Sequence, residues 1–258
     1  MKSDVVKQII DEQKPCYFIS PHLDDVVLSA SALIFQLRKH VSITVVNVFT
    51  QADKPPYTFS AKSYLRQCGY NDAEKLFQDR IKEDQSVLEN LADSVINLNF
   101  IDAQWRKRTN QNRLQHSLSS LLPELIHTYP TYRFHIRKPI ISTEDASMIT
   151  QIKERLKAIV KNGAVFCPLA IGSHIDHIIV RSVCEDLFYK PVFWADCPYM
   201  KNKKITIQVK NMTSFTISQD LTLKQELVSG YETQYKAMFG SNALVFLPET
   251  YFVTDAST

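Results

Sequence analysis

The amino-acid sequence predicts a single α/β domain with a mostly parallel sheet that is flanked by helices. Short runs of β-branched and aromatic residues alternate with longer amphipathic segments along most of the 258 residues. This alternation is typical of strand–helix–strand units, which build parallel sheets covered on both faces. No stretch rich in Gly, Pro or Ser divides the chain. We therefore expect one domain over residues 1–258, with enough length to bury a substantial core.

The first half of the chain contains three predicted strands and two helices. Apolar or β-branched runs over residues 16–20, 42–49 and 94–100 predict the strands. Apolar residues recur at nearly helical spacing over residues 25–40, and a long charged helix is predicted from residue 63 to residue 91.

The second half continues this alternation after an irregular stretch that holds one predicted helix over residues 113–127. The later helices are predicted over residues 145–162, 174–188 and 221–239, and the later strands over residues 164–169, 192–195 and 251–253. Residues 204–209 and 214–217 predict an antiparallel hairpin added at one edge of the sheet.

Composition excludes several classes of protein. The net charge of +3 is mild, whereas a nucleic-acid-binding protein usually concentrates much more positive charge on one face. The five glycines are too far apart for the glycine-rich loops that bind dinucleotides or triphosphates. Five cysteines without a CxxC pair are typical of reduced thiols. The chain has no signal-peptide core and no apolar run of membrane-spanning length, so we expect a cytoplasmic protein; whether it forms a homo-oligomer stays open.

Two polar segments follow predicted strands. The first reads SPHLDD at residues 20–25, and the second reads GSHIDH at residues 172–177. Ligands of open α/β sheets bind at the carboxyl ends of the strands, so we expect both segments at the same edge of the sheet. Together they supply three histidines and three carboxylates.

This set of side chains fits a catalytic metal site. Zinc in such sites takes three ligands from His, Asp and Glu and keeps a fourth position for water. His22 and Asp25 lie three residues apart across a strand-to-helix turn, and His177 can complete the triad. We expect one zinc ion per chain, although iron or cobalt would also suit these ligands.

Three further residues of the two segments are predicted to assist catalysis. Asp24 is not needed as a ligand and can take a proton from the water at the metal. His174 lies one helical turn before His177 and can stabilise a developing oxyanion. Asp176 is placed to orient a histidine ligand. Each segment alone would also fit a simpler interpretation, a polar helix start that caps free N–H groups; their occurrence after two equivalent strands favours the metal site.

The two segments resemble the PHPDDE and HxDH signatures of the PIG-L/LmbE-like deacetylases. Weaker resemblances are RIKED at residues 80–84, DCPY at residues 196–199, and a K…Y-x-x-Q pattern over residues 224–234. The resemblance implies a Rossmann-like fold, zinc on the triad described above, and hydrolysis of an N-acyl group, commonly acetyl, on an amino sugar. Arg80 is a candidate for binding the substrate, although an ion pair with Glu83 is the simpler expectation.

The sequence departs from the family pattern near the first segment. Leu23 replaces a proline, and Val26 replaces a glutamate, which would remove a hydrogen bond that orients the ligands. The expected function is removal of an N-acetyl or other N-acyl group from an amino sugar or glycoconjugate. Two alternatives stay open: an amidase that cleaves a larger acyl or thiol conjugate, and a catalytically silent sugar-binding protein that keeps the metal.

Overall fold

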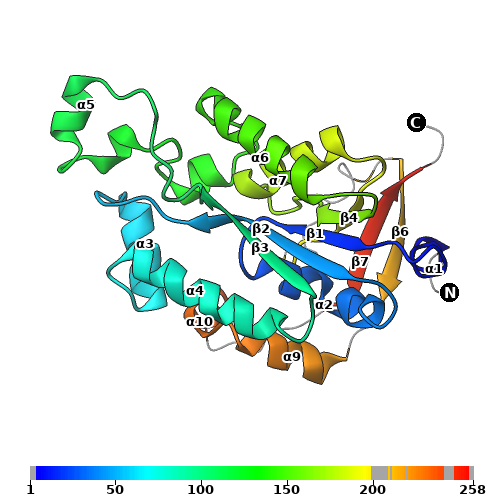
Figure 1. The fold of residues 1–258 in the computed structure, drawn as a ribbon. Helices are drawn as coiled ribbons and strands as arrows, with labels where there is room; N and C mark the ends of the chain where they lie inside the picture. Colours follow the sequence, from blue (N-terminus) through cyan, green and yellow to red (C-terminus); the bar gives the residue numbers. More distant parts are fainter. Residues whose placement is uncertain (1–3, 199–208, 210, 219, 241–246, 256–258) are drawn as a thin grey trace.

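A seven-stranded sheet forms the centre of the described part of the molecule (Figure 1). The structure is a computed structural model that describes residues 4–198, 209, 211–218, 220–240 and 247–255. The strands follow the order β3-β2-β1-β4-β5-β7-β6. The predicted fold class, a mostly parallel sheet with an antiparallel edge and flanking helices, is confirmed.

Five strands of the sheet are parallel. They are β1 (Cys16–Ser20), β2 (Ile43–Gln51), β3 (Ser94–Ile101), β4 (Ala164–Pro168) and β5 (Val192–Trp194). The chain runs outward from β1 through β2 to β3 and then returns to the other side of β1 with β4 and β5. The strand order therefore reverses between β1 and β4, and such a reversal leaves a crevice at the carboxyl ends of these two strands.

The antiparallel edge is built from β7 (Glu249–Thr254) and β6 (Met212–Ile217). β7 pairs with β5 on one side and with β6 on the other. The predicted hairpin arm over residues 214–217 is thus part of an antiparallel edge strand, and its partner is the last strand of the chain. The other predicted arm, over residues 204–209, lies outside the described residues except for Val209.

Helices cover both faces of the sheet. One face carries α2 (Asp25–Leu37), α4 (Ala73–Leu88), α9 (Leu221–Ser229) and α10 (Glu232–Phe239), and the other carries α6 (Ala146–Ile159) and α7 (Ile175–Leu187) (Figure 1). α1 (Asp4–Asp11), α3 (Phe59–Cys68) and α5 (Arg113–Leu118) complete the named helices. Within the described residues, none of the helices combines the length and the apolar character that crossing a bilayer requires.

Three predicted helices are interrupted in the structure. The helix predicted over residues 63–91 is divided into α3 and α4 by Gly69, whose φ of +80° ends α3 in a left-handed cap. The helix predicted over residues 221–239 is divided at Gly230, where a Cβ atom would lie 2.5 Å from a methyl group of Val87 on α4. The bend lets the chain pass close to α4. A glycine within a helical pattern indicates a possible helix end, so both interruptions could have been predicted from the sequence.

The helix predicted over residues 113–127 is also shorter. It ends with α5 at Leu118, and a 3₁₀ turn (Pro123–Ile126) follows. Proline has no backbone N–H and disfavours a helical conformation at the residue before it, and Leu122 accordingly has φ −129° and ψ 72°. The α1 helix was not predicted.

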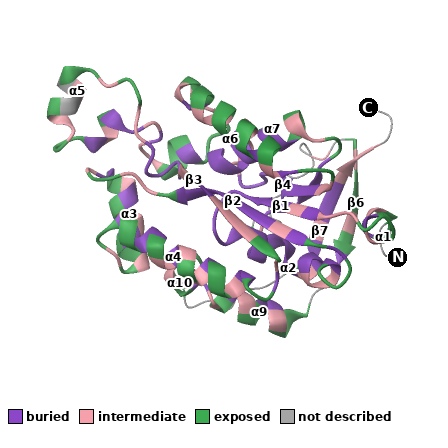
Figure 2. Ribbon diagram, in the orientation of Figure 1, coloured by how far each residue is buried: buried purple, intermediate pink, exposed green. Residues whose placement is uncertain are grey.

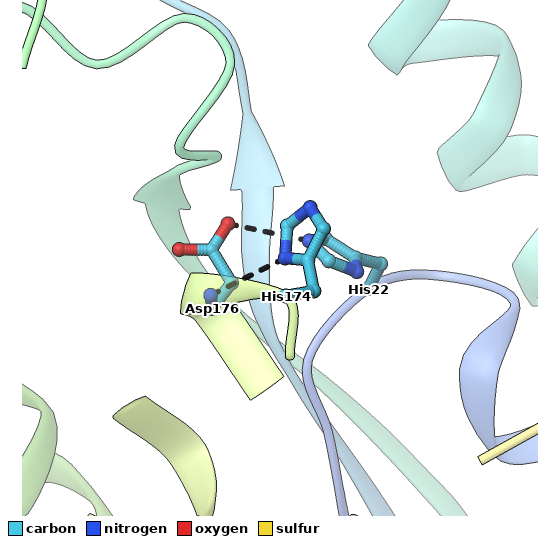
Figure 3. A group of neighbouring side chains, drawn as sticks. All are labelled: His22, His174 and Asp176. Carbon is cyan, nitrogen blue, oxygen red and sulfur yellow. Dashed lines mark hydrogen bonds and ion pairs between the residues drawn. The ribbon is translucent and has the colours of Figure 1, made fainter. Parts of the chain in front are cut away.

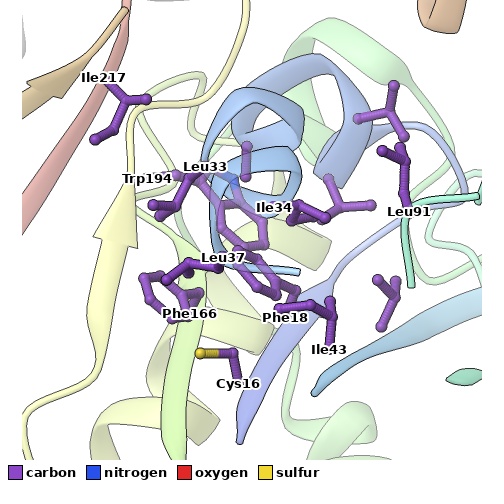
Figure 4. Packing of buried hydrophobic residues seen from close by; sticks show 14 of the residues in the cluster. Cys16, Phe18, Leu33, Ile34, Leu37, Ile43, Leu91, Phe166, Trp194 and Ile217 are labelled. Atoms are coloured by element: carbon purple, nitrogen blue, oxygen red, sulfur yellow. The ribbon is translucent and has the colours of Figure 1, made fainter. Parts of the chain in front are cut away.

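Two apolar layers hold the helices against the sheet. On the α2 side, Phe18 stacks on Phe166 with ring centroids 4.5 Å apart, and Trp194 lies beside them (Figure 4). On the other side, α6 and α7 pack on the sheet through aliphatic residues such as Ile152 and Ile179. The central strands are buried almost throughout (Figure 2). The carboxyl ends of β1 and β4 are therefore held in place by packed apolar layers on both faces of the sheet.

Candidate active site

The two polar segments meet at the carboxyl edge of β1 and β4. His22 lies in the turn between β1 and α2, while His174 and His177 lie at the start of α7. The ring centroids are 5.0 Å apart for His22 and His174, 5.3 Å for His22 and His177, and 5.4 Å for His174 and His177. Residues about 150 positions apart thus form one cluster.

One group in this cluster has the geometry of a metal site. The Oδ2 atom of Asp25 lies 3.0 Å from Nδ1 of His22 and 3.2 Å from Nε2 of His177. The three possible ligand atoms lie within 4.8 Å of one another, and all three residues are buried. Two imidazole nitrogens and one carboxylate oxygen are a ligand set that suits a divalent transition metal.

A second group, His22, His174 and Asp176, also lies within 4.8 Å (Figure 3). Its carboxylate is already engaged: Asp176 accepts hydrogen bonds from the backbone N–H of Ala103 at 2.8 Å and from Nη2 of Arg106 at 2.6 Å. Asp25 also accepts one backbone N–H, that of His22, but no arginine is paired with it among the described residues, so the first group offers the more available carboxylate.

The local hydrogen bonds explain how each segment is shaped. Ser20 Oγ donates to the carbonyl of His22 and accepts from the N–H of Val26, which closes the turn. Asp24 begins α2, but its side chain makes no capping hydrogen bond. Helix capping therefore does not account for Asp24. His174, in contrast, does cap α7, because its Nδ1 atom accepts from the N–H of Asp176 at 3.3 Å.

Carboxylates contact the ring nitrogens of His177 and His22 that do not face Asp25. Nδ1 of His177 lies 2.6 Å from Oδ1 of Asp196, whose other oxygen accepts from the N–H of Ile171. Nε2 of His22 lies 3.3 Å from Oδ2 of Asp176 and 3.4 Å from Oδ2 of Asp102. The placement of Asp176 fits its predicted part in orienting a histidine. The sequence analysis gave Asp196 no role, and it missed Asp102 although this residue directly follows the strand β3.

Arg80 points at Asp24. Its Nη2 atom lies 3.7 Å from Oδ1 of Asp24, and both side chains are buried. The alternative partner, Glu83, instead accepts hydrogen bonds from the backbone and hydroxyl of Thr233. Among the described atoms, Nε of Arg80 has no hydrogen-bond partner. Arg80 thus borders the pocket with an unused hydrogen-bond donor.

The other residues of the weak C-terminal resemblance are spread over the molecule. Tyr231 donates to Oδ1 of Asp84 at 2.8 Å, and burial raises the pKa of Asp84 to about 7. Gln234 borders the pocket at the site. Lys224 lies away from the cluster and forms a buried ion pair with Glu249 at 2.6 Å. Only Gln234 of these three thus reaches the pocket.

Charges in the cluster shift the pKa values of the two neighbouring aspartates, Asp24 and Asp25, in opposite directions. Burial and the negative charge of Asp25 raise the pKa of Asp24 above its usual value. Burial would also raise the pKa of Asp25, but the charge and hydrogen bonds of His177 and His22 outweigh it and hold that pKa well below its usual value. Asp25 is therefore the fixed anion of the pair, and Asp24 is the carboxyl that takes up a proton more readily.

The pKa values of His22 and His174 are also shifted in opposite directions. Burial lowers the pKa of His22, but hydrogen bonds with Asp176 and Asp25 and the charges of Asp25 and Asp102 raise it to about 10. For His174 the balance is opposite: burial and the charge of His22 outweigh the charges of Asp176 and Asp25 and hold its pKa well below the usual value. His174 is thus a neutral ring whose Nδ1 atom accepts a hydrogen bond, so its hydrogen is on Nε2.

These features define an α/β protein with a candidate metal site of the hydrolase type at the edge of its sheet. The sequence model of the PIG-L family, described as GlcNAc-PI de-N-acetylase, matches residues 17–188. The chain belongs to this family. The predicted family and the predicted class of enzyme, a hydrolytic N-deacetylase acting on a sugar conjugate, are thereby confirmed.

Solved structures with the same fold include several deacetylases. A zinc-inhibited form of a teicoplanin deacetylase matches with a TM-score of 0.73 and 21% identity over 94% of this chain and 100% of that chain. The A40926 pseudoaglycone deacetylase matches with a TM-score of 0.64 and 21% identity over 93% of this chain and 97% of that chain.

A more distant match is the N,N'-diacetylchitobiose deacetylase from Pyrococcus horikoshii. Its TM-score is 0.51 and its identity 13%, over 90% of this chain and 76% of that chain. At these identities, all three structures show a shared fold. A search of curated proteins found no significant match.

Proposed function

We propose that the protein is a zinc-dependent deacetylase that hydrolyses the N-acetyl group of an amino sugar within a larger conjugate. The observation that carries this proposal is the convergence of His22, Asp25 and His177 beside the buried carboxyl of Asp24. The family description, GlcNAc-PI de-N-acetylase, and the deacetylases among the similar structures support the same chemistry.

The metal would be held by Nδ1 of His22, Oδ2 of Asp25 and Nε2 of His177. A zinc ion bound there supplies Lewis acidity, which polarises the acetyl carbonyl group and makes water a better nucleophile near neutral pH. Asp176 and Asp196 hold the outer nitrogens of the two rings, and such partners fix the ring orientation and increase the basicity of the ligands. Iron or cobalt would suit the same ligands.

Asp24 moves the proton in this proposal. Its Oδ1 atom faces Arg80, so Oδ2 is the oxygen that accepts a proton from the attacking water. Asp24 then returns the proton to the nitrogen of the departing amine. Burial, the largest cause of the raised pKa of Asp24, supports this second step, because a carboxyl that holds a proton more readily is a better acid near neutral pH.

His174 stabilises the charge that develops on the carbonyl oxygen. Its Nδ1 atom accepts the N–H of Asp176, which leaves Nε2–H as the donor. A neutral donor that is already oriented costs no reorganisation when the oxyanion forms. The low pKa of His174 supports this assignment.

The two other functions stay as alternatives with less support. The presence of both Asp24 and His174 in the cluster speaks against a silent sugar-binding protein. An amidase for a larger acyl group would use the same residues, and the substrate alone would distinguish it. We keep the cytoplasmic location and the single domain as predictions; the five cysteines, all free, are consistent with a reducing compartment.

The test measures acetate release and metal content together. Metal-depleted protein should release no acetate from a panel of N-acetylated amino sugars, and one equivalent of zinc should restore the release. His177→Ala should neither bind zinc tightly nor release acetate. Acetate release that persists without metal, or a His177→Ala protein with full zinc content, would refute the proposal.

A further inference from the structure

One wall of the pocket at the site is formed by α10 together with α3 and α4, on which α10 packs (Figure 1). The pocket has a volume of about 670 Å³ and also contains the three histidines and Asp24. Gln234 lies on the first turn of α10 and borders the pocket, although this residue is 2% exposed. The catalytic steps proposed above do not use Gln234.

The protein itself does not fully satisfy the amide group of Gln234. The Oε1 atom accepts a long hydrogen bond, 3.5 Å, from the hydroxyl group of Tyr64, which also borders the pocket. The Nε2 atom has no hydrogen-bond partner among the described atoms. A buried donor without a partner destabilises a folded protein, so it needs an explanation. A ligand that enters the pocket and supplies the missing partner is such an explanation.

A second buried donor beside the pocket is in the same condition. Nε of Arg80 also lacks a hydrogen-bond partner within the described part of the chain, and Arg80 is 3% exposed. The guanidinium group lies over the ring of Phe77, with 4.9 Å between Cζ and the ring centroid, while Nη2 faces Asp24. Because Arg80 and Gln234 border the same pocket, one ligand can approach the free donors of both residues.

Two neighbouring carboxylates of α4 hold Gln234 in place. Glu83 accepts hydrogen bonds from the backbone N–H and the hydroxyl group of Thr233 at 2.9 and 2.6 Å. Asp84 accepts a hydrogen bond from the hydroxyl group of Tyr231 at 2.8 Å. The start of α10 is thereby attached to α4 on the residues that precede Gln234. A donor that is held in this way loses little conformational entropy when it binds a ligand.

The chemistry of these donors favours a hydroxyl group as their ligand. An amide can turn by 180°, which exchanges its donor with its acceptor, and a hydroxyl group pairs with either orientation because it both accepts and donates hydrogen bonds. The same hydroxyl oxygen can accept a hydrogen bond from Arg80. A carboxylate only accepts and an ammonium group only donates, so each fits one orientation of the amide. The ring of an N-acetylated amino sugar carries hydroxyl groups beside its acetamido group.

We infer that Gln234 binds a hydroxyl group on the ring of the amino sugar and thereby determines which sugars the protein deacetylates. This inference rests on the proposed deacetylase function. It adds one chemical feature of the substrate to that function, a free hydroxyl group on the ring that carries the amide. Gln234 acts on binding and takes no part in the transfer of the proton.

The first experiment measures acetate release from four compounds by the zinc-loaded protein. They are the methyl β-glycoside of N-acetylglucosamine and its 3-, 4- and 6-deoxy analogues. We expect one analogue to have a kcat/KM value roughly tenfold or more below that of the parent compound, because it leaves a buried donor unpaired. The loss should appear mainly in KM, since the hydrogen bond exists in the ground state and the transition state alike.

The second experiment removes the amide group. Gln234→Leu and Gln234→Met keep a side chain of similar size without the amide. In both variants, the parent compound and the sensitive analogue should differ in kcat/KM by less than about threefold, while the other two analogues keep their wild-type ratios to the parent. A purely structural effect would instead lower all four values by the same factor. Gln151→Leu is the matched control: Gln151 is exposed on α6 and is not among the described residues that line the pocket, so all ratios should stay at the wild-type values.

The outcomes separate the two proposals. Four equal kcat/KM values in the wild-type protein, or Gln234 variants that keep the wild-type ratios, would overturn the inference and leave the deacetylase function intact. Hydrolysis of none of the four compounds would count against the deacetylase function. Titration calorimetry with the same compounds then decides about Gln234: weaker binding of one analogue that disappears in Gln234→Leu supports the inference, and equal binding or no binding of the four compounds overturns it.

Discussion

Two adjacent aspartates at the end of β1 have opposite environments. The carboxylate of Asp25 contacts two imidazoles and the backbone N–H of His22, whereas that of Asp24 faces a single guanidinium at 3.7 Å. Asp25 therefore resembles a metal ligand, and Asp24 resembles a proton carrier.

This difference predicts opposite results for the two residues. Asp24→Asn should retain about one metal ion per chain but lose roughly 10²–10⁴-fold in kcat, the usual contribution of a positioned acid–base group. Asp25→Ala should lose the metal. Metal content by elemental analysis and acetate release on the same samples give the comparison. An Asp24→Asn protein with normal turnover would show that another group moves the proton.

His174 gives a second prediction at this scale. Because its proposed hydrogen bond forms with an oxyanion near the transition state, His174→Ala should lower kcat by about 10²–10³-fold and change KM little. It should also keep its metal. Steady-state kinetics and zinc titration measure both effects. If His174→Ala loses zinc instead, the ligand group shown in Figure 3 is the real one.

Val26 illustrates where family comparison and structure differ. The resemblance suggested that a glutamate here would assist the ligands, but Val26 is completely buried in the apolar layer under α2. Val26→Glu would place an unpaired carboxylate in that layer. We expect it to lower the free energy of unfolding by about 3–5 kcal/mol, similar to other uncompensated buried charges. Val26→Ile, which adds one apolar carbon, should cost less, about 1–3 kcal/mol; equal costs in urea unfolding would contradict this explanation.

At the scale of the elements, one arginine joins three segments behind the site. Arg106, in the loop after β3, donates to Asp176 at the start of α7 at 2.6 Å and to Asp145 before α6 at 2.9 Å. Tyr129 donates to the same oxygen of Asp145 at 2.7 Å. The orientation of Asp176, and through it the ring of His22, thus depends on Arg106.

Arg106 should therefore influence metal binding without touching the metal. Arg106→Lys cannot reproduce two divergent hydrogen bonds, so we expect a 10–100-fold loss of zinc affinity, the range found for residues that orient ligands. Competition with a chelator measures the affinity. Arg181→Lys, which alters a partly buried arginine of α7 that pairs with Glu185, is the control. An unchanged zinc affinity in folded Arg106→Lys would mean that Asp176 is held sufficiently by the N–H of Ala103.

The sequence predicted the elements and residues whose signals are local. Strand patterns and the two motifs led to the parallel sheet and to the six polar residues at its edge. Arg106 could not be predicted, because its partners lie about 40 and 70 positions away and no spacing relates them. Asp102 could have been: it directly follows β3, as His22 nearly follows β1, and the same rule applies to both. The breaks at Gly69 and Gly230 were visible as well but were outweighed by long amphipathic patterns.

At the scale of the whole molecule, the segment after the residues matched by the family model supplies the strands β5, β6 and β7 of the sheet. The match ends at residue 188, before β5, and the last strands and helices close the antiparallel edge and the face under α2. Glu249 on β7 connects these parts. Its carboxylate accepts hydrogen bonds from Lys224 on α9 and from backbone N–H groups of Ala32 and Leu33 on α2. One buried carboxylate therefore joins the end of the chain to the helix that begins at the site.

This connection predicts that Lys224 is important for stability although it lies outside the site. Both side chains of the Lys224–Glu249 pair are 2% exposed, so Lys224→Met leaves a buried carboxylate without its cation and should cost about 3–5 kcal/mol. Adding Glu249→Gln should recover part of this loss, since no charge then remains to be compensated. Lys153→Met, which removes an ion pair at the surface, should cost at most about 1 kcal/mol. Urea unfolding of the four proteins measures these differences, and a Lys224→Met cost no larger than that of Lys153→Met would show that the remaining donors to Glu249 suffice.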